Sequence, residues 1–471
     1  MMALMPREET QTTTQATPRS PDPRRAGEPP TTRAWTLRFV VVGLVLAALN
    51  LRPAITSLGA LLEEVRVGLG MSGTVAGVLT SVPPLCFAAF GVMAPKLARR
   101  FGPAAVVCAG MAAIAAGLAI RPFAGGTPGF LAASALALMG IAVSNILMPV
   151  IVKRWFPDRV ATMTGLYSMA LSLGTSLAAA ATVPLTSALG GKWQTGLGLW
   201  ALVAAAAVLP WLPLVRERRT AGGGATESAV TEGAVTEGAV TESADKSARA
   251  QDARAQDARA QAKGGLALPI TRSRTAWALA GFFGLQATGA YITMGWMPQI
   301  FRDAGVPAST AGVLLAVTMA MGVPLAFVIP RVAGRLRNQG PIAVVLGSCG
   351  LIGYAGLFLA PAAGAWVWAV VLGVSNCSFP LALTMVGMRA GTGAGVAKLS
   401  AFAQSTGYLL SIPGPLLVGV LYQHSGGWGL PIALMAGLML PQIALGILAG
   451  RNRTVEAELA DRAGAGSKAA A

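Results

Sequence analysis

The segment from Gly70 to Ala98 reads GMSGTVAGVLTSVPPLCFAAFGVMAPKLA and carries no charged side chain before Lys96. A helix rises about 1.5 Å per residue, so roughly 20 apolar residues cross hydrocarbon about 30 Å thick. This segment is therefore long enough to span a bilayer. The whole chain has the same character, because 54% of its 471 residues are hydrophobic and only 12% are charged. That balance leaves too little polar surface for a water-soluble domain.

A related segment, GVPASTAGVLLAVTMAMGVPLAFVIPRVA, lies 235 positions later, from Gly305 to Ala333. The identical residues in the first copy are Gly70, Ala76, Gly77, Val78, Leu79, Val82, Pro95 and Ala98. A second pair of motifs places Ser144-Asn145 just before Pro149 and Ser375-Asn376 just before Pro380. These echoes predict two parallel six-helix halves, an arrangement typical of transporters whose substrate binds where the halves meet.

Charge-free runs elsewhere complete the set of predicted spans. In the first part they are Phe39–Leu62 (interrupted by Arg52), Val67–Pro95, Phe101–Ile120, Pro122–Val152, Val160–Gly191 and Trp193–Val215. In the second part they are Thr275–Phe301, Ala304–Pro330, Asn338–Met388 and Leu399–Gly450, and each of the last two is long enough for two helices. We therefore predict an all-α membrane protein with twelve transmembrane helices in two six-helix pseudo-repeats.

The predicted domain organisation follows from these runs and from composition. We expect a disordered cytoplasmic tail (1–36), an N-terminal six-helix half (37–215), a disordered cytoplasmic linker (216–273), a C-terminal six-helix half (274–450) and a cytoplasmic tail (451–471). The linker contains the repeats Ala-Val-Thr-Glu-Gly and Ala-Arg-Ala-Gln-Asp, which have almost nothing to bury. Low complexity of this kind is typical of disorder.

The net charge of +17 reflects short basic clusters between apolar runs, with no aromatic-interleaved patch that would indicate nucleic-acid binding. With the N-terminus inside, the cytoplasmic loops hold Lys96, Arg99, Arg100, Lys153, Arg154, Arg159, Arg331, Arg335, Arg337, Arg389 and Lys398, and the opposite loops only Arg66, Arg121, Lys192 and Arg302. This asymmetry predicts that both termini are cytoplasmic. Seven tryptophans near predicted span ends, among them Trp296, are expected to be interface anchors.

Arg52 is the deepest charged side chain in any predicted span, 14 residues after Arg38 and 11 before Glu63. A charge near the bilayer midplane costs about 2.5–3.5 kcal/mol on insertion scales and usually faces a cavity. Pro53 follows directly and predicts a kink. We expect Arg52 to bind an anionic or strongly polar solute. The alternative is that helix carbonyls or amide side chains of neighbouring helices satisfy it, and that it only holds its helix in place.

Other polar side chains lie deep in spans one, four, five, seven, ten and eleven. They are Asn50, Asn145, Tyr167, Gln286, Tyr291, Asn376, Gln404 and Tyr408. Together with Arg52 they form the predicted substrate-binding set. Each one alone is also a candidate for an ordinary hydrogen bond between helices.

The chain resembles the major facilitator superfamily, and within it the cyanate and 2-nitroimidazole permease (CynX/NimT) family, over about residues 38–450. The motifs that carry the resemblance are Asn50-Leu-Arg-Pro-Ala-Ile-Thr-Ser57, Ala94-Pro-Lys-Leu-Ala-Arg-Arg100 and Val152-Lys-Arg-Trp-Phe-Pro157 leading into Met163-Thr-Gly-Leu-Tyr-Ser168. The resemblance implies a twelve-helix carrier of the bacterial cytoplasmic membrane that works by alternating access.

The superfamily also has a conserved loop between spans two and three, which the resemblance marks as a conformational element. Gly91, Lys96, Arg99 and Arg100 match its pattern, and Arg331 and Arg335 are the repeated basic residues in the second half. Pro95 stands where the pattern has an acidic residue, so the carboxylate that usually forms the charge contact at this loop is missing. A simple topology signal is the alternative role of these basic residues.

The expected function is transport of a small anionic or polar organic solute, with import and export both open. A drug or nitroheterocycle exporter is the alternative. A membrane sensor would carry a folded output domain, and an intramembrane enzyme would need paired catalytic groups, neither of which the sequence shows. We expect a monomer with no catalytic residue, metal or cofactor. Its partners would be the solute, the bilayer, and a coupling proton or counter-anion, with no nucleic acid.

Overall fold

The structure, a computed structural model, describes residues 30–215 and 270–470 and is built from helices. The first group contains α1 (Pro30–Asn50), α2 (Pro53–Ala60), α3 (Leu62–Gly68), α4 (Gly73–Phe101), α5 (Pro103–Ile120), α6 (Thr127–Trp155), α7 (Val160–Ala188) and α8 (Trp193–Val208). The second contains α11 (Arg274–Asp303), α12 (Ala308–Ala320), α13 (Gly322–Arg335), α14 (Gly340–Leu359), α15 (Ala365–Asn376), α16 (Ser378–Met388), α17 (Gly393–Ser411), α18 (Pro413–Ser425) and α19 (Gly429–Ala449). Most of the expected linker, residues 216–269, lies outside the described residues.

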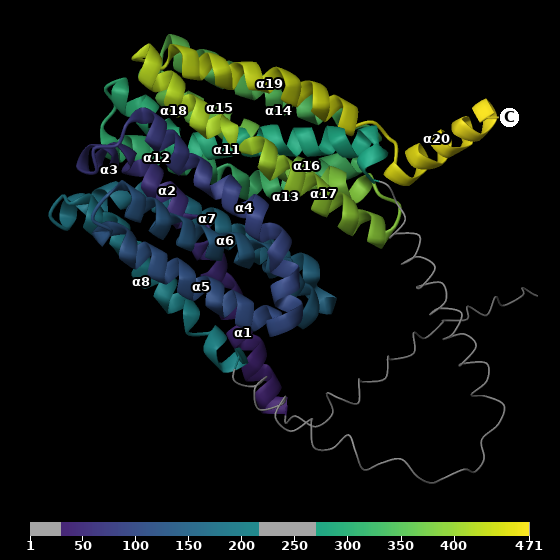
Figure 1. The fold of residues 1–471 in the computed structure, drawn as a ribbon, viewed down its shortest axis with the longest axis horizontal. Coiled ribbons are helices and arrows are strands. Elements are labelled where there is room, and N and C mark those ends of the chain that lie inside the picture. The colour runs from purple at the N-terminus through teal and green to yellow at the C-terminus, as the bar shows by residue number, and fades with distance from the viewer. Residues whose placement is uncertain (1–29, 216–269, 471) are drawn as a thin grey trace, which may run out of the picture.

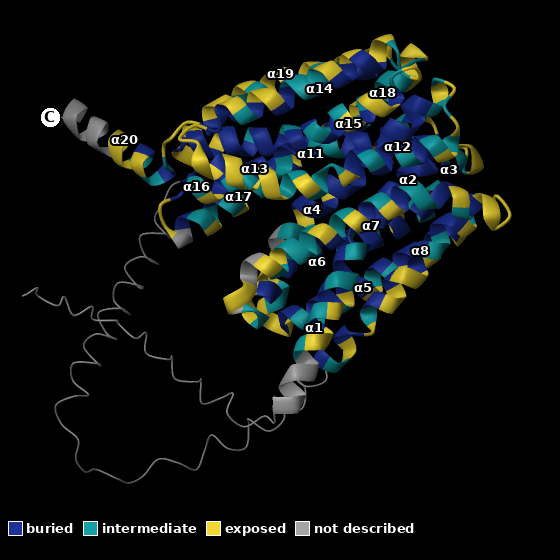
Figure 2. Cartoon of the chain, turned by 180° about the vertical axis from the view of Figure 1, so that it is seen from behind, coloured by how far each residue is buried: buried dark blue, intermediate teal, exposed yellow. Residues whose placement is uncertain are grey.

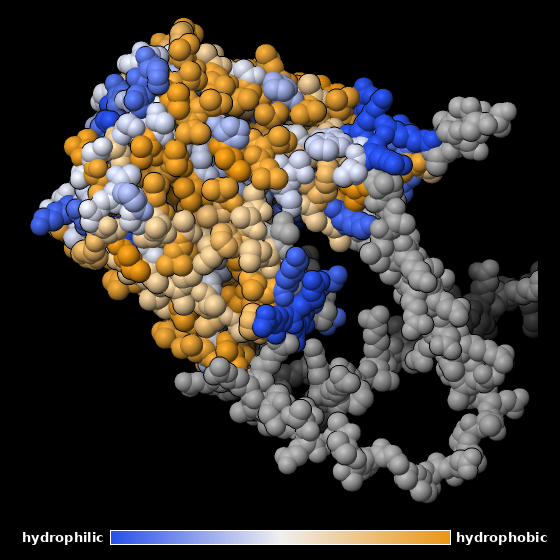
Figure 3. Space-filling view, viewed as in Figure 1, coloured by the Kyte–Doolittle hydropathy of each residue, from blue (hydrophilic) through white to orange (hydrophobic). Residues whose placement is uncertain are grey.

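Ten spans in the described ranges are long and apolar enough to cross a membrane. Helix α8 is apolar but has only 16 residues, whereas α11 has 30 residues and carries more polar side chains. Adding these two helices to the ten gives the predicted twelve. Space-filling atoms show the consequence, because apolar residues cover the middle of the surface and hydrophilic residues gather at its ends (Figure 3). Exposed apolar side chains such as Leu202, 67% accessible, therefore face lipid.

Four spans are broken near their centres, and the breaks place backbone polar groups at membrane depth. The first break separates α1 from α2 at Arg52, where Pro53 begins the new helix as predicted. The others separate α12 from α13, α15 from α16 and, at Pro413, α17 from α18. Proline has no N–H to donate, so an interrupted ladder at such positions is expected. Irregular backbone at this depth is tolerated where it is buried or lines a cavity.

The motifs that predicted duplicated halves have matching packing roles. A Cβ on Gly110 of α5 would lie 2.4 Å from Ser144 Oγ of α6. In the second group a Cβ on Gly350 of α14 would lie 2.7 Å from Ser375 Oγ of α15. Each echoed serine therefore sits against a glycine of the preceding span. Small residues allow helices in a membrane to approach this closely.

The two groups touch at one end and separate at the other. Helix α4 packs against α17 and α18, and α2 packs against α11. Helix α7 packs mainly against α12 and only slightly against α13. Figures 1 and 2 show the groups diverging toward the end where α1 begins and α20 (Val455–Ala470) lies. We call this the basic end, because α4 and α13 finish there with exposed Lys96, Arg99, Arg100, Arg331 and Arg335. The opposite end is the closed end.

Glycines let the backbones meet at the closed end. A Cβ on Gly419 of α18 would lie 2.4 Å from Gly73 O and 2.8 Å from Gly77 Cα of α4. A Cβ on Gly59 of α2 would meet Met294 O of α11 at 1.9 Å. No side chain larger than hydrogen fits at these positions while the closed end stays closed.

Helix α20 docks against the start of the second group through Glu458, which is 2% exposed. Its carboxylate accepts hydrogen bonds from the Ser273 hydroxyl and from the N–H groups of Arg274 and Thr275. Burial raises the pKa of Glu458, but these hydrogen bonds outweigh burial and lower the pKa to about 2. The segment 451–471 therefore contains a helix that caps α11. Helix α1 likewise begins at Pro30, inside the expected N-terminal tail 1–36.

Candidate functional site

Arg52 lies at the break between α1 and α2, inside the span Leu37–Ala60, and is half-buried. Its guanidinium lies within electrostatic range of the hydroxyls of Tyr167, Tyr291 and Tyr408. Tyr167 belongs to α7 of the first group, whereas Tyr291 of α11 and Tyr408 of α17 belong to the second. Four predicted residues therefore meet between the groups. In the part of the chain that the structure describes, no carboxylate pairs with Arg52.

Asn145 of α6 joins this cluster through Tyr167. The Tyr167 hydroxyl donates a hydrogen bond of 2.5 Å to Asn145 Oδ1. The amide therefore orients the phenol that faces Arg52. Its counterpart in the repeat, Asn376, has a different environment, because its Nδ2 donates to Met319 Sδ of α12 at 3.9 Å. The duplicated asparagines thus have unequal roles.

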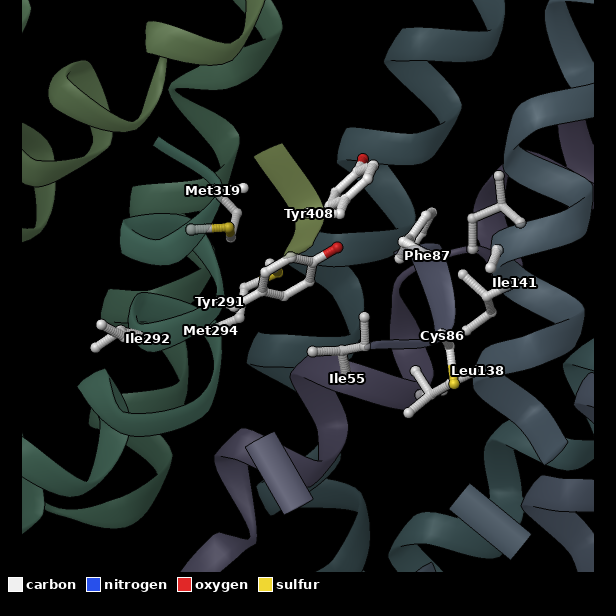
Figure 4. Close-up of a cluster of buried hydrophobic side chains, with 14 of the residues drawn as sticks. Ile55, Cys86, Phe87, Leu138, Ile141, Tyr291, Ile292, Met294, Met319 and Tyr408 are labelled. Carbon is white, nitrogen blue, oxygen red and sulfur yellow. The ribbon is translucent and has the colours of Figure 1, made fainter. Parts of the chain in front are cut away.

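Aromatic rings form one wall of the cluster. The ring of Phe87 from α4 stacks on Tyr408 with centroids 4.9 Å apart, and Phe283 of α11 meets the same ring edge-on at 5.2 Å. Figure 4 shows Tyr291 and Tyr408 beside Phe87, with Ile55 nearby. Offset stacking and edge-to-face contacts are favourable for aromatic rings. Sequence reasoning missed Phe87 and Phe283, since a phenylalanine in an apolar span carries no signal beyond burial.

Two other predicted residues form hydrogen bonds away from Arg52, and a third has an oxygen that is unpaired within the described ranges. The Asn50 amide is 1% exposed and donates to Leu46 O at 2.8 Å and to Val203 O of α8 at 3.3 Å. Gln404 donates to Ser400 Oγ on its own helix. Gln286 is 5% exposed, and its Oε1 has no partner among the described residues. Asn50 thus forms the helix-to-helix hydrogen bond that was its alternative role.

Arg121 is buried deep, although its sequence position predicts an outer loop. It begins the short helix η2 (Arg121–Phe123) after α5, and the side chain is 2% exposed. Its Nη1 donates to Ala54 O, two residues beyond Arg52, at 3.1 Å. The only sequence signal for this depth is that Arg121 directly follows a charge-free run, so a long side chain can extend back into the span.

The closed end is held by polar contacts between the groups. Arg302 of α11 pairs with Glu64 of α3 at 2.8 Å, and Gln423 of α18 accepts from the hydroxyl of Thr74 at 2.9 Å. Trp296 is 1% exposed and donates its indole N–H to Thr80 of α4. The expectation that Trp296 is an interface anchor is therefore wrong, because the indole fills the contact between α4 and α11.

The predicted conformational loop residues lie at the basic end. Lys96, Arg99 and Arg100 are exposed at the end of α4, and Arg331 and Arg335 are exposed on α13. Gly91 lies inside α4, where its Cβ would meet Ile146 of α6 at 2.9 Å. Since the groups diverge at this end, the basic clusters of the two halves are not packed together.

Comparison with known proteins gives a consistent family. Residues 40–397 match the model of the Major Facilitator Superfamily. YycB of Bacillus subtilis, an uncharacterized transporter, is 32% identical over 88% of this chain and 94% of its own length. The 2-nitroimidazole transporter of Escherichia coli is 30% identical over 88% and 96%, and the cyanate transport protein CynX of the same organism is 27% identical over 84% and 94%.

Solved structures share the fold at lower identity. The proton:xylose symporter XylE superposes with a TM-score of 0.63 at 12% identity, over 91% of this chain and 99% of that one. The nucleoside transporter NupG gives 0.61 at 13% identity, over 88% and 98%. The family match, the relatives and the shared fold agree with the predicted all-helical membrane protein. The chain is therefore a multi-pass membrane transporter that belongs to the Major Facilitator Superfamily.

Proposed function

We propose that this transporter carries a small anionic or polar organic solute, and that Arg52 is its central binding residue. The observation that carries the proposal is the meeting of the Arg52 guanidinium with three tyrosine hydroxyls from both groups. A half-buried cation inside a membrane span that has no carboxylate partner among the described residues favours an anion or a strong hydrogen-bond acceptor. Guanidinium groups bind carboxylate-like acceptors in a bidentate manner.

The position of the cluster supports alternating access. Its side chains come from the break between α1 and α2 and from α7, α11 and α17, so a relative movement of the groups changes which end has access to Arg52. We assign residues 37–215 and 274–450 to the two moving halves, with 216–273 as their linker. Both halves of the site come from one chain, so a monomer suffices.

The basic end faces the cytoplasm in this proposal, together with both chain termini, since exposed arginine and lysine concentrate there. The structure is then open toward the cytoplasm, because the groups diverge at the basic end and touch at the closed end. In this state the solute would bind at Arg52 from the cytoplasm or be released from Arg52 into it. Opening the closed end would give access from outside.

A carrier of nitroheterocycles is the second candidate. The observation in its favour is the aromatic wall, in which Phe87 and Tyr408 stack at 4.9 Å beside the Arg52 cluster. A flat ring fits against such a wall, and a nitro group presents two acceptor oxygens to a guanidinium. The relative that is named for 2-nitroimidazole makes this solute a necessary probe.

Thermal unfolding of the detergent-solubilised protein tests the proposal, because a ligand that binds only the folded state raises the unfolding temperature. Cyanate, 4-hydroxybenzoate, 2-nitroimidazole and neutral amino acids are the probes. We expect an anion to stabilise the wild type, Arg52→Gln to remove that effect, and Arg52→Lys to keep part of it because the charge remains without the planar fork.

Asn50→Ala is the matched control, since it removes a polar side chain two residues away that faces α8. It should lower the unfolding temperature without changing the shift that the anion produces. Stabilisation of Arg52→Gln by the anion as large as that of the wild type would refute the role of Arg52. Stabilisation confined to 2-nitroimidazole would assign the site to nitroheterocycles.

A further inference from the structure

Arg121 places a second guanidinium on the closed-end side of the Arg52 cluster. Among the described residues, Nη1 alone has an acceptor, the carbonyl of Ala54. Its Cζ lies 5.5 Å from the centroid of the Phe130 ring of α6, a weak cation–π contact. Nε and Nη2 are buried and have no hydrogen-bond partner in the part of the chain that the structure describes.

The Arg121 side chain also lines a small pocket. Arg121 and Ser134 line it together with parts of α2, α4 and α11, including Ala54, Thr80 and Gly295. Arg121 Nη1 donates to the carbonyl of Ala54, another lining residue. Ser134 is 1% exposed, and its hydroxyl also lacks a partner among the described residues. Three unpaired donor atoms, Arg121 Nε and Nη2 and Ser134 Oγ, therefore belong to side chains of one pocket.

Such an arrangement is energetically costly unless a ligand uses it. A buried polar group without a hydrogen bond costs roughly 1–3 kcal/mol in proteins, and an unpaired buried charge costs more. No carboxylate of the described ranges forms an ion pair with Arg121. The donors match a small oxyanion or a carboxylate, which accepts several hydrogen bonds at once.

The pocket has only about 10 Å³ of free volume, on the order of one water molecule. It is this narrow because α11 covers it at the closed end. Gly295 packs on Thr80, with 2.8 Å between a built Cβ and Thr80 Cγ2, and Trp296 donates to the Thr80 hydroxyl. If the closed end opens, α11 moves away from α4 and this wall is removed. Arg121 and Ser134 then face the widened space between the groups.

We propose that Arg121 and Ser134 form a second anion-binding station, which opens when the closed end opens and passes an anionic solute toward Arg52. Tyr291 links the two stations, since it lines the Arg121 pocket and its hydroxyl lies within electrostatic range of Arg52. This inference rests on the proposed anion transport. It adds a receiving site on the outer side of the central one.

The test measures access of charged thiol reagents to the pocket. Ser134→Cys is made in full-length protein whose four native cysteines (Cys86, Cys108, Cys349 and Cys377) are replaced by alanine. Gly77→Trp or Gly419→Trp is added to hold the closed end open, because both glycines pack on backbone of the other group. The reagents are an anionic sulfonatoethyl and a cationic trimethylammonioethyl methanethiosulfonate.

We expect the introduced thiol to react slowly with the closed end intact and at least tenfold faster in either tryptophan variant. The anionic reagent should be preferred over the cationic one by on the order of tenfold, because a nearby positive charge attracts one and repels the other. Arg121→Gln should remove the preference, and 4-hydroxybenzoate should slow the reaction. The control is Ser144→Cys. Ser144 lies on α6 like Ser134 but is buried against Gly110 of α5, so the introduced thiol should stay unreactive.

Two results would overturn the inference. A thiol at position 134 that stays unreactive in both tryptophan variants would show that the pocket does not open outward. Equal rates for the two reagents with native Arg121 would show that this guanidinium only ties η2 to α2. Arg52→Gln in the same background separates this idea from the central-site proposal, because it should leave the reagent preference unchanged even if Arg52 binds no solute.

Discussion

Adding one methyl group at Gly419 should shift the equilibrium between the two access states. The Cβ of Gly419→Ala would lie 2.4 Å from Gly73 O and 2.8 Å from Gly77 Cα, both backbone atoms of α4. No side-chain rotation relieves such contacts, so α4 and α18 must separate. Overpacking of this kind costs typically 1–3 kcal/mol. The cost applies only while the closed end is closed.

At 1.36 kcal/mol per factor of ten, that cost raises the population of the outward-open state roughly 5- to 150-fold relative to the closed one. Spin labels on Lys192→Cys and His424→Cys report the change, because both positions are exposed at the closed end on different groups. Pulsed electron paramagnetic resonance should show a larger long-distance population for Gly419→Ala. The same four native cysteines are removed beforehand.

Gly437→Ala on α19 is the matched control, since no atom lies within 4 Å of its built Cβ. It should leave the distance distribution unchanged. If Gly419→Ala folds with a distance distribution identical to that of the parent, the tight contact between α4 and α18 does not control opening, and the reasoning is refuted.

Other contacts lead to further expectations. Glu64→Gln removes the ion pair between the groups that Glu64 forms with Arg302. The pair is partly exposed and worth about 0–1 kcal/mol, so its loss should favour outward opening only weakly. The same spin labels should show this effect fading in high salt. The folded pKa of Glu458 is lowered to about 2, so its contribution to docking of α20 is present above about pH 4.5 and is lost as the pH falls toward 2. Amide hydrogen exchange in α20 should therefore accelerate below pH 4, and Glu458→Gln should exchange fast at every pH. Asn50→Ala should cost about 1–2 kcal/mol of stability through its lost bond to α8, measured as a lower unfolding temperature with unchanged anion affinity.

Much of the candidate site could be named from sequence, but its grouping could not. Arg52, Tyr167, Tyr291 and Tyr408 are polar residues in apolar spans, which made each a candidate. Asn50 gave the same signal, yet it bonds to α8. Asn50 ends α1, whereas Arg52 lies in the break before α2, so the relative directions of the two side chains do not follow from the period of one helix. Only the packing of neighbouring helices shows which direction is the space between the groups.

Two misreadings have a common physical cause. Trp296 and Arg121 lie near span ends, and a span end is where indoles and long cationic side chains usually meet the interface. Trp296 instead lies under α4 at the closed end, and Arg121 extends inward to Ala54. Position along a span is a property of the sequence, whereas the direction of a side chain depends on which helix covers that face.

The order of residues alone predicts the twelve spans, the duplicated halves and the place of Arg52 inside the first span. These are local properties, because hydropathy over about 20 residues decides membrane crossing and repeated motifs follow from the order of residues alone. Only the tertiary structure decided that Arg52 meets tyrosines of both groups, that glycines close one end, and that Arg121 has unpaired donors beside a pocket. Those features depend on the rotation and separation of helices that are far apart in the chain, and side-chain contacts between helices set both quantities.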